Sequence, residues 1–396
     1  MTVVFIPKET AAGETRVAAT PETVAKMAKN GLNVLIERGA GEESFFCDSA
    51  YQEEGATIVD SADGFSRGDL VLKVAPPSTA EAGSLKKGAV LVSFLMAGQN
   101  QDASHAMLNG GATAFGMELV PRITRAQKMD ALSSQANIGG YKAVLNGATA
   151  LGKYFPLLMT AAGTVKPAKV VIFGVGVAGL QAIATAKRLG SQVWATDIRP
   201  EVKEQVESLG AKFIEIESDD GQTEPSVYAK EASDDYKKRQ AEAVAAHVSE
   251  ADVVITTALI PGRPAPMLIP AAMVESMKAG SVIVDLAVSQ GGNCELSQCG
   301  EDVVAHGVTI LGHPNLPATV PVNASELYSR NVLQVVEHLV PVKENENHDL
   351  ILDFDDEITA GSVAIHGGSA LHEPTATALG VPVTKTKTPQ ESETTS

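Results

Sequence analysis

Short runs of β-branched and apolar residues alternate with helical patterns through the first third of the chain. This alternation is typical of a parallel sheet whose strands are joined by crossover helices. The predicted strands cover residues 3–6, 33–36, 57–59, 69–74, 89–94 and 112–115. A helix is predicted between the first two strands, because Thr20 suits an N-cap, Pro21 fits the first helical position and Gly31 follows the end.

A helical pattern over residues 130–153 leads into a second alternating region. The strands predicted there cover residues 170–173, 193–197, 212–216, 253–256, 282–286 and 309–311. A helix over residues 325–339 is expected to return to the first domain, which is therefore discontinuous. The pattern predicts an α/β chain of two Rossmann-like, doubly wound parallel-sheet domains separated by a cleft. Residues 1–137 and 325–375 are assigned to the first domain, and residues 138–324 to the second.

Two segments do not follow this alternation. Residues 217–240 form a polar insertion, rich in Asp, Glu, Ser and Lys, which we expect to be a functional loop. Residues 376–396, rich in Pro, Thr, Ser and Lys, are expected to form a disordered tail. That tail is either an inert terminus or a tether.

The strand over residues 170–173 runs into a glycine turn that opens a helix, and the next strand ends at Asp197. In such a unit Gly174 permits the tight turn, Gly176 lets backbone amides approach a pyrophosphate, and Gly179 lets the helix lie close to the sheet. A carboxylate about 20 residues further on accepts both ribose hydroxyls and repels a 2′-phosphate. We therefore predict an NAD(H) site, the alternative being a glycine-rich turn that binds nothing. The residues assigned to the site are Gly174, Val175, Gly176, Val177, Ala178, Gly179, Asp197 and Ile198.

The composition limits the class of protein. With 396 residues, 44% of them hydrophobic, the chain is long enough for two cores. Its 31 basic and 48 acidic residues give a net charge of -17, which disfavours nucleic acid and anionic lipid as direct partners. Cys47, Cys294 and Cys299 show no metal-ligand spacing, so no metal is expected and the thiols are interpreted as reduced, as in the cytoplasm. No signal peptide is expected, and no apolar run reaches the roughly 20 residues of a membrane span.

Residues 121–144, which read PRITRAQKMDALSSQANIGGYKAV, resemble the family of alanine dehydrogenases and proton-translocating transhydrogenases. The resemblance continues through FGVGVAGL (173–180), KEQV (203–206), TTALIPG (256–262) and VDLA (284–287), and it is stronger to the transhydrogenases. It implies an NAD(H)-binding subunit that presents NADH for hydride transfer to NADP⁺ held on a partner component. It also implies coupling to proton translocation by a membrane-spanning component, and a homodimer that docks peripherally on the cytoplasmic face of the membrane through these partners.

The alanine dehydrogenases place a catalytic His and a catalytic Asp at positions that match Met96 and Ser289 of this chain. Oxidation of an amine needs a positioned base, whereas hydride transfer between two nicotinamides exchanges no proton. Arg16 and Lys73 match the dehydrogenases' contacts to the substrate carboxylate, and the alternative for both is a structural role beside buried carboxylates or at an interface. A self-sufficient NAD-dependent amino-acid dehydrogenase and a non-catalytic, NAD-responsive binding subunit are the alternative functions.

Four residues of the resembling loop are assigned to the reaction, namely Arg122, Gln127, Asp130 and Ser133. Arg122 is a fixed fork of donors for the nicotinamide carboxamide or a phosphate, and Gln127 offers a donor and an acceptor to the partner's nucleotide. Asp130 accepts from an amide, and Ser133, one helical turn on, also reaches the carboxamide. The alternative is that Asp130 caps the following helix while Arg122 is a solvated surface charge.

Further residues are assigned with the nucleotide. Tyr228 resembles the tyrosine of a loop that closes over bound nucleotide, and the alternative is a lone aromatic residue that anchors a loose loop. Ala258, Leu259 and Pro261 follow the fourth strand of the second domain, where they are expected to pack on adenine or ribose. His313 lies beyond a strand end and is assigned no role.

Overall fold

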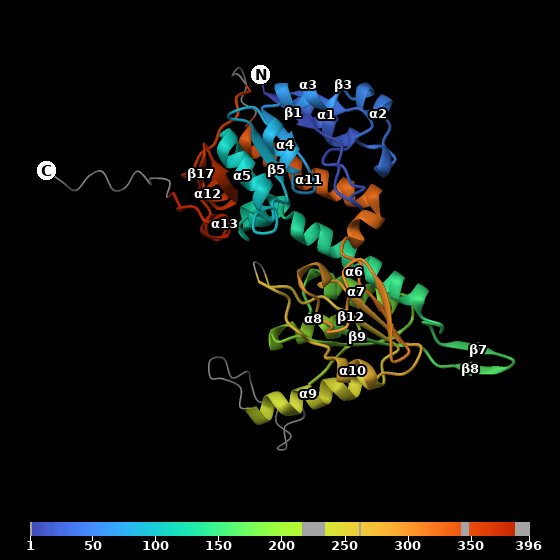
Figure 1. Ribbon diagram of the computed structural model, residues 1–396. Helices are drawn as coiled ribbons and strands as arrows, with labels where there is room; N and C mark the ends of the chain where they lie inside the picture. Colours follow the sequence, from blue (N-terminus) through green and yellow to red (C-terminus); the bar gives the residue numbers. More distant parts are fainter. Residues whose placement is uncertain (1, 216–233, 261–262, 342–347, 385–396) are drawn as a thin grey trace. The chain divides into compact units, whose positions relative to one another are not determined.

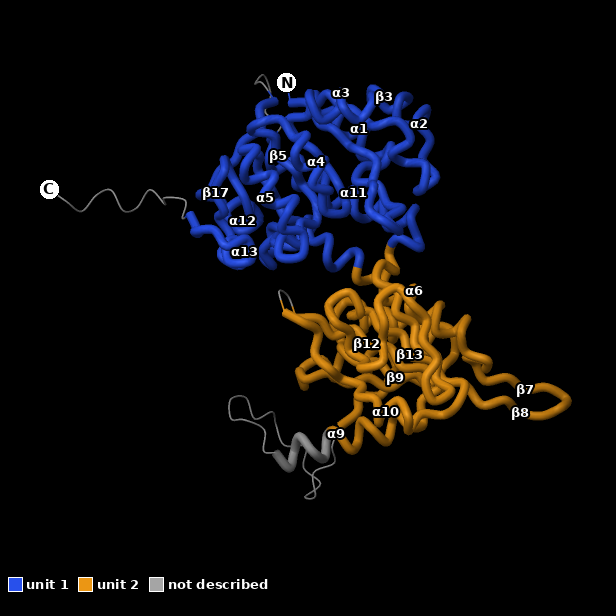
Figure 2. Tube along the Cα trace, viewed as in Figure 1, with its two compact units in different colours: residues 1–135, 318–396 blue, residues 136–317 orange. Residues whose placement is uncertain are grey.

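The computed structural model describes residues 2–215, 234–260, 263–341 and 348–384. The chain divides into two compact units, shown in Figure 2: unit 1 comprises residues 1–135 and 318–396, and unit 2 comprises residues 136–317. Unit 1 is therefore discontinuous in sequence. The helix α6 (Ala131–Ala150) contains the boundary between the two stretches of chain.

Unit 1 contains an eight-stranded sheet in the order β17-β16-β6-β5-β4-β1-β2-β3 (Figure 1). The parallel strands are β1 (Val3–Ile6), β2 (Asn33–Glu37), β3 (Thr57–Val59), β4 (Leu70–Leu72), β5 (Val90–Ser93) and β6 (Thr113–Gly116). The antiparallel strands β16 (Val363–His366) and β17 (Ser369–Ala370) extend one edge. The helices of this unit are α1 (Pro21–Lys29), α2 (Asp48–Glu53), α3 (Ser61–Arg67), α4 (Thr79–Ser84), α5 (Gln101–Gly110), α11 (Pro321–Leu339), α12 (Glu357–Ser362) and α13 (Glu373–Leu379).

Both faces of the unit 1 sheet are buried. Val4 and Ile6 belong to a cluster with α1 and α11, whereas Phe5 belongs to a second cluster with α3 and α5. Successive side chains of a strand point to opposite faces, so a strand covered on both sides must be apolar throughout. This explains why the strands of the chain appear as continuous apolar runs rather than as alternating patterns.

Unit 2 contains a seven-stranded sheet in the order β11-β10-β9-β12-β13-β15-β14. Its strands are β9 (Lys169–Phe173), β10 (Gln192–Thr196), β11 (Lys212–Phe213), β12 (Val253–Thr256), β13 (Val282–Asp285), β14 (Asp302–Ala305) and β15 (Val308–Leu311), and β14 alone of these runs antiparallel. The unit also contains most of α6 and the helices α7 (Val177–Arg188), α8 (Lys203–Ser208), α9 (Asp234–Ser249) and α10 (Ala271–Glu275). The strand order reverses between β9 and β12, and this switch point is where doubly wound sheets bind ligands.

The predicted fold class is confirmed: each unit has a Rossmann-like, mostly parallel sheet, and every predicted strand overlaps an observed one. Five strands were not predicted, namely β14, β16, β17 and the hairpin of β7 (Leu158–Thr160) and β8 (Gly163–Val165). These strands have two to four residues and lie at sheet edges or outside the main sheets, so their pattern of apolar residues is too short to register.

Two other segments differ from the prediction. The polar insertion expected over 217–240 is helical from Asp234, where α9 begins, and residues 216–233 with Tyr228 lie outside the described residues. The tail expected from residue 376 includes the end of α13, where Ala376 and Leu379 pack into the core of unit 1. Burial of these two side chains gives the segment a stabilising contact that its overall polar composition does not suggest.

Candidate functional site

The glycine turn lies at the carboxyl end of β9, beside the switch point of the unit 2 sheet. Gly174 has φ +90°, a left-handed conformation that side chains disfavour, and a Cβ built on it would lie 2.6 Å from Thr257 Oγ1. A Cβ on Gly179 would lie 1.9 Å from the carbonyl oxygen of Gly174, so this glycine is required for α7 to approach the turn. Each of these two glycines therefore has the structural role that a dinucleotide turn requires.

Gly176 differs from the other two glycines. It is exposed, it is the N-cap residue of α7, and no described atom lies within 4 Å of a Cβ built on it. The first amides of a helix have no partner within the helix, and the helix dipole favours an anion at that end. Open space at Gly176 next to these amides fits a pyrophosphate, because a side chain there would fill the room that the phosphates need.

Asp197 follows β10 and its side chain is only 6% exposed. Its carboxylate accepts hydrogen bonds from the Val175 amide at 2.7 Å, from the Arg199 amide at 2.9 Å, and from Arg199 Nε and Nη2 at 3.0 Å each. Burial alone raises the pKa of Asp197, but the Arg199 guanidinium and the two amides outweigh it and hold the pKa below its usual value. The carboxylate is thus ionised near neutral pH and tied to the glycine turn.

The loop after β12 completes this edge of unit 2. Thr257 Oγ1 donates to the carbonyl oxygens of Phe173 and Gly174, both at 3.1 Å, and so fastens the loop to the glycine turn. Leu259 is exposed, as is Ile198 after β10, which is 94% exposed. Two such apolar side chains at the carboxyl ends of neighbouring parallel strands suit the faces of an adenine or ribose. Pro261 lies outside the described residues.

Two residues that we did not predict hold this loop. Asn293 accepts from the Ala258 amide at 3.1 Å and donates to the carbonyl oxygens of Ala258 at 2.9 Å and Pro266 at 2.8 Å. Asp285, buried at the end of β13, accepts from the Asn293 amide at 2.8 Å and from Thr256 Oγ1 at 3.0 Å. A polar residue at the end of a predicted strand is the signal for Asp285, whereas the sequence has no comparable signal for Asn293.

The loop of Arg122, Gln127, Asp130 and Ser133 belongs to unit 1, so the structure presents the two parts of the predicted site in separate units. Arg122 and Gln127 are exposed, and the chain between them enters the 3-10 helix η3 (Thr124–Met129). Asp130 caps α6: its carboxylate accepts from the Ser133 amide at 2.9 Å and from Ser133 Oγ at 2.5 Å. The capping interpretation of Asp130 is thus observed, and it fixes the orientation of both polar groups.

The same loop is held against α11. Asn331 Nδ2 donates to the Lys128 carbonyl oxygen at 2.8 Å, and Ser134 Oγ donates to Asn331 Oδ1 at 2.7 Å. Ala126 and Met129 point into the core of unit 1. The loop is therefore rigidly supported from below while the side chains of Arg122 and Gln127 reach solvent.

Arg16 and Lys73 are buried in unit 1 beside carboxylates. Arg16 Nε and Nη2 donate to the two oxygens of Glu14 at 2.7 and 2.6 Å. Lys73 Nζ lies 3.0 Å from a carboxylate oxygen of Glu9 and 3.0 Å from one of Glu81. Burial alone lowers the pKa of Lys73, but the two carboxylates outweigh it and raise the pKa above its ordinary value. Both cations take part in internal ion pairs.

The positions that match the catalytic acid–base residues of alanine dehydrogenases carry neither His nor Asp. Met96 has φ +43°, and its amide donates to Glu118 Oε1 at 2.8 Å. Ser289 is exposed in the 3-10 helix η5 (Val288–Gln290). His313 Nε2 lies 2.8 Å from Asp302, an exposed pair at the edge of unit 2.

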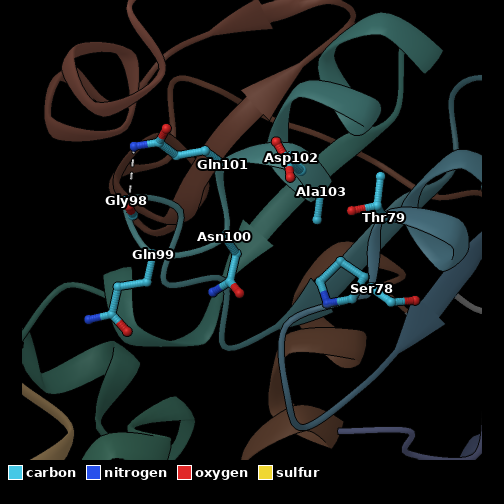
Figure 3. A pocket seen from close by; sticks show the side chains of 9 residues that line it. Ser78, Thr79, Gly98, Gln99, Asn100, Gln101, Asp102 and Ala103 are labelled. Carbon is cyan, nitrogen blue, oxygen red and sulfur yellow. Dashed lines mark hydrogen bonds between the residues drawn. The ribbon is translucent and has the colours of Figure 1, made fainter.

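A polar pocket of about 500 Å³ opens in unit 1 at the first turns of α4 and α5 (Figure 3). Its lining residues are Pro77, Ser78, Thr79, Gly98, Gln99, Asn100, Gln101, Asp102 and Ala103. No predicted site residue lines it. Among the described residues, no group of three or more His, Cys, Asp or Glu side chains is placed to hold a metal ion. Within that same part of the chain, no helix combines the length and apolar character needed to span a bilayer.

Comparison with known proteins matches almost the whole chain to one family. The model described as "Alanine dehydrogenase/PNT, N-terminal domain" matches residues 5–139, and the model described as "Alanine dehydrogenase/PNT, C-terminal domain" matches residues 143–373. The two models together cover both stretches of unit 1 up to residue 373 and nearly all of unit 2.

Individual relatives fall into the two branches of this family. An NAD(P) transhydrogenase alpha subunit of Rhodospirillum rubrum is 48% identical over 377 residues, which is 93% of this chain and 97% of that protein. The alanine dehydrogenase of Mycobacterium tuberculosis is 32% identical over 397 residues, or 96% of this chain and 98% of that protein. Among solved structures, the transhydrogenase from Sinorhizobium meliloti is similar with a TM-score of 0.84 and 45% identity, covering 93% of this chain and 99% of that one.

Proposed function

Because this chain belongs to the alanine dehydrogenase/PNT family, we propose that it is the NAD(H)-binding alpha subunit of a proton-translocating NAD(P) transhydrogenase. The observation that carries the proposal is a pairing within one chain. Unit 2 has a complete dinucleotide turn with an ionised carboxylate at Asp197, and the dehydrogenases' acid–base positions are Met96 and Ser289. The identity to a transhydrogenase alpha subunit, 48% against 32% to an alanine dehydrogenase, supports the same branch.

The missing acid–base pair favours exchange of a hydride alone. An amino-acid dehydrogenase must take a proton from the amine as the hydride leaves, so it needs a base beside the reacting carbon. A methionine has no group that titrates near neutral pH, and a serine hydroxyl needs another base to activate it. Hydride transfer between two nicotinamides makes no such demand, and these residues suit it.

The described residues assign the binding of NAD(H) to unit 2. The amides at the N-terminus of α7 would hold the pyrophosphate over Gly176, and Asp197 would accept from the adenosine ribose hydroxyls. Ile198, Ala258 and Leu259 would pack on the adenosine. The dinucleotide, when bound, supplies or accepts the hydride. Tyr228 and Pro261, in keeping with the resemblance, belong to the same proposed site.

The loop of unit 1 is assigned to the nicotinamide end. Arg122 would donate to the carboxamide or a phosphate, and the Asp130–Ser133 pair would orient that carboxamide. Gln127, exposed on a supported loop, would donate to and accept from the nucleotide of the partner. The fixed backbone below these side chains keeps the orienting groups in place without reorganisation.

We propose that NADP(H) is held by a separate NADP-binding component, because the sequence contains one dinucleotide fingerprint. A membrane-spanning component would couple the reaction to proton translocation, with this chain docked peripherally on the cytoplasmic face. A homodimer is also proposed. The β7–β8 hairpin extends away from the unit 2 sheet (Figure 2), and Met159 on it is 78% exposed, which suits an arm that packs on a second copy.

The alternative function is a self-sufficient amino-acid dehydrogenase. The retention of Arg16 and Lys73, which match the dehydrogenases' substrate contacts, favours it. The internal ion pairs of these two cations give them a structural role that does not require a substrate.

The test is a deuterium-transfer assay. The purified chain is mixed with NAD⁺ and C4-deuterated NADPH, with and without the cognate NADP-binding component, and the NADH formed is analysed by mass spectrometry. We expect deuterated NADH only with both proteins present. Turnover of NAD⁺ with alanine or another small amino acid by this chain alone would establish the dehydrogenase instead. Tight NADH binding without transfer in the complete mixture would leave a binding subunit.

A further inference from the structure

The helix α6 makes a backbone contact with the first turn of α7. Gly140 of α6 is buried, and a Cβ built on it would lie 2.0 Å from the carbonyl oxygen of Ala178, 2.8 Å from its carbonyl carbon and 3.0 Å from its Cα. Both residues belong to unit 2. A real Cβ does not approach a backbone atom this closely, so only glycine is compatible with this contact.

The contact falls on the part of α7 that bears the phosphate-binding amides. Ala178 lies between Val177 and Gly179 in the first helical turn, directly after the open N-cap at Gly176. The turn is thus held on two sides. Gly179 lets it touch the carbonyl of Gly174 at the end of β9, and Gly140 lets α6 touch the carbonyl of Ala178.

A second bond joins the same two helices one turn further on. Asn137 Nδ2 donates to Gln181 Oε1 at 3.1 Å. Gln181 in turn donates through Nε2 to Thr185 Oγ1 at 3.1 Å, within α7. The helices are therefore in register with each other, and a shift of α6 at residue 140 would be transmitted to the start of α7.

We propose that Gly140 is a positioning residue for the dinucleotide turn, in effect a fourth glycine of the fingerprint that a different helix supplies. Its missing side chain allows α6 to support the α7 N-terminus at the depth that pyrophosphate binding requires. The proposal rests on the proposed function in one respect, namely that NAD(H) is the ligand of unit 2. It assigns no contact between Gly140 and the nucleotide.

The substitution Gly140→Ala tests the contact. To bring the new Cβ from 2.0 Å to an ordinary distance, α6 or the first turn of α7 must move by about 1 Å or more. A misplacement of about 1 Å at a binding group costs up to about 100-fold, so we expect the dissociation constant of NADH to rise roughly 10- to 100-fold.

The neighbouring glycine provides a matched control. A Cβ on Gly139 would meet only Leu286 Cδ2 at 3.6 Å, an ordinary contact. Gly139 and Gly140 lie in the interior of the same helix and are both buried. Exchange for alanine removes the same backbone flexibility from both, so Gly139→Ala has the same helix effect without the collision. We expect Gly139→Ala to bind NADH within about twofold of the wild type, since its contact is ordinary.

A purely structural defect would also weaken binding, so the readout must separate the two. We propose to compare ADP, which carries the pyrophosphate, with adenosine, which has none, by isothermal titration and ligand-observed NMR. In Gly140→Ala the affinity for ADP and NADH should fall while that for adenosine stays unchanged. Equal loss of all three ligands, or NADH binding equal to that of Gly139→Ala, would overturn the proposal.

Amide hydrogen exchange on the wild-type chain keeps the proposal testable if Gly140→Ala does not fold. Saturating NADH should slow exchange in α6 around residues 139–142 together with the first turn of α7. Slowing in α7 without any change in α6 would refute the coupling. If the wild-type chain fails to bind NADH at all, the proposed function fails. If it binds NADH and the two alanine variants behave alike, only the role of Gly140 fails.

Discussion

Removal of the Asp197 carboxylate tests the specificity of the proposed NAD(H) site most directly. In Asp197→Ala the ribose hydroxyls would lose a charged acceptor, and hydrogen bonds to charged groups contribute about 1.5–3 kcal/mol each. Loss of one such bond corresponds to a roughly 10- to 150-fold rise in the dissociation constant of NADH. Because the pKa of Asp197 lies below its usual value, this carboxylate is already ionised above about pH 4, and the effect should be constant between pH 6 and 8.

The same substitution releases Arg199, which now donates to Asp197 through Nε and Nη2. Arg199 is 50% exposed, so its ion pair contributes only about 0–1 kcal/mol to stability and the variant should fold normally. A released guanidinium at the strand end suits a 2′-phosphate. We therefore expect affinity for NADPH to rise, and the preference for NADH over NADPH to fall by about 100-fold or more once both effects combine.

Titration of NADH and NADPH into four proteins measures these effects. Glu201→Ala, which removes an exposed carboxylate close by, controls for net charge and should keep the wild-type preference. The double variant Asp197→Ala/Arg199→Ala should bind both nucleotides weakly, since it lacks both the acceptor and the guanidinium. An unchanged NADH preference in Asp197→Ala would show that this carboxylate does not face the ribose, and the assignment of the fingerprint would be wrong.

Three further predictions concern other parts of the molecule. Gln127→Asn should slow deuteride transfer in the reconstituted complex by about tenfold, the value of one hydrogen bond, while NADH affinity stays within about twofold; a normal transfer rate would exclude Gln127 from the reaction. Asp285→Asn should lower the free energy of unfolding in urea by about 3 kcal/mol, because the buried carboxylate accepts from three backbone amides and two hydroxyls, and an amide nitrogen would face some of these donors. Burial and the charge of Lys169 lower the pKa of His247, whose ring lies 5.8 Å from that of Trp194, so tryptophan emission should be steady at pH 7 and fall with a midpoint below 6.5 on acidification. A midpoint at or above 6.5, or the same acid-dependent decrease in His247→Gln, would contradict this assignment.

The sequence predicted those parts of the site that local spacing determines. The order of strand, glycine turn and helix is encoded within a dozen residues, and Asp197 was found because strand ends in a parallel sheet gather at one edge. Thr257 and Asn293 were missed because their partners lie far away in the chain: Thr257 bonds to Gly174, and Asn293 to Ala258. Polar residues at these positions are common in any loop, so only the folded backbone distinguishes them.

Two residues show the limit of this approach more closely. Gly140 was visible in the sequence as one of two adjacent glycines, but nothing local distinguishes the one that touches α7 from its neighbour Gly139. Asp130 had two interpretations, as a cap and as a ligand of the carboxamide. The observed bonds to Ser133 establish the cap, and they leave the proposed second role dependent on the same geometry.

The two units show why the fold alone could not predict a ligand. Both have the doubly wound strand order, with switch points between β1 and β4 in unit 1 and between β9 and β12 in unit 2. At the end of β1, however, Pro7 offers no amide and Glu9 places a carboxylate beside Lys73, where unit 2 has Gly174 and an open helix N-terminus. A pyrophosphate would meet a negative charge at the one turn and free space at the other. The chemistry of each unit is therefore set by the few residues of its first turn, on sheets of the same topology.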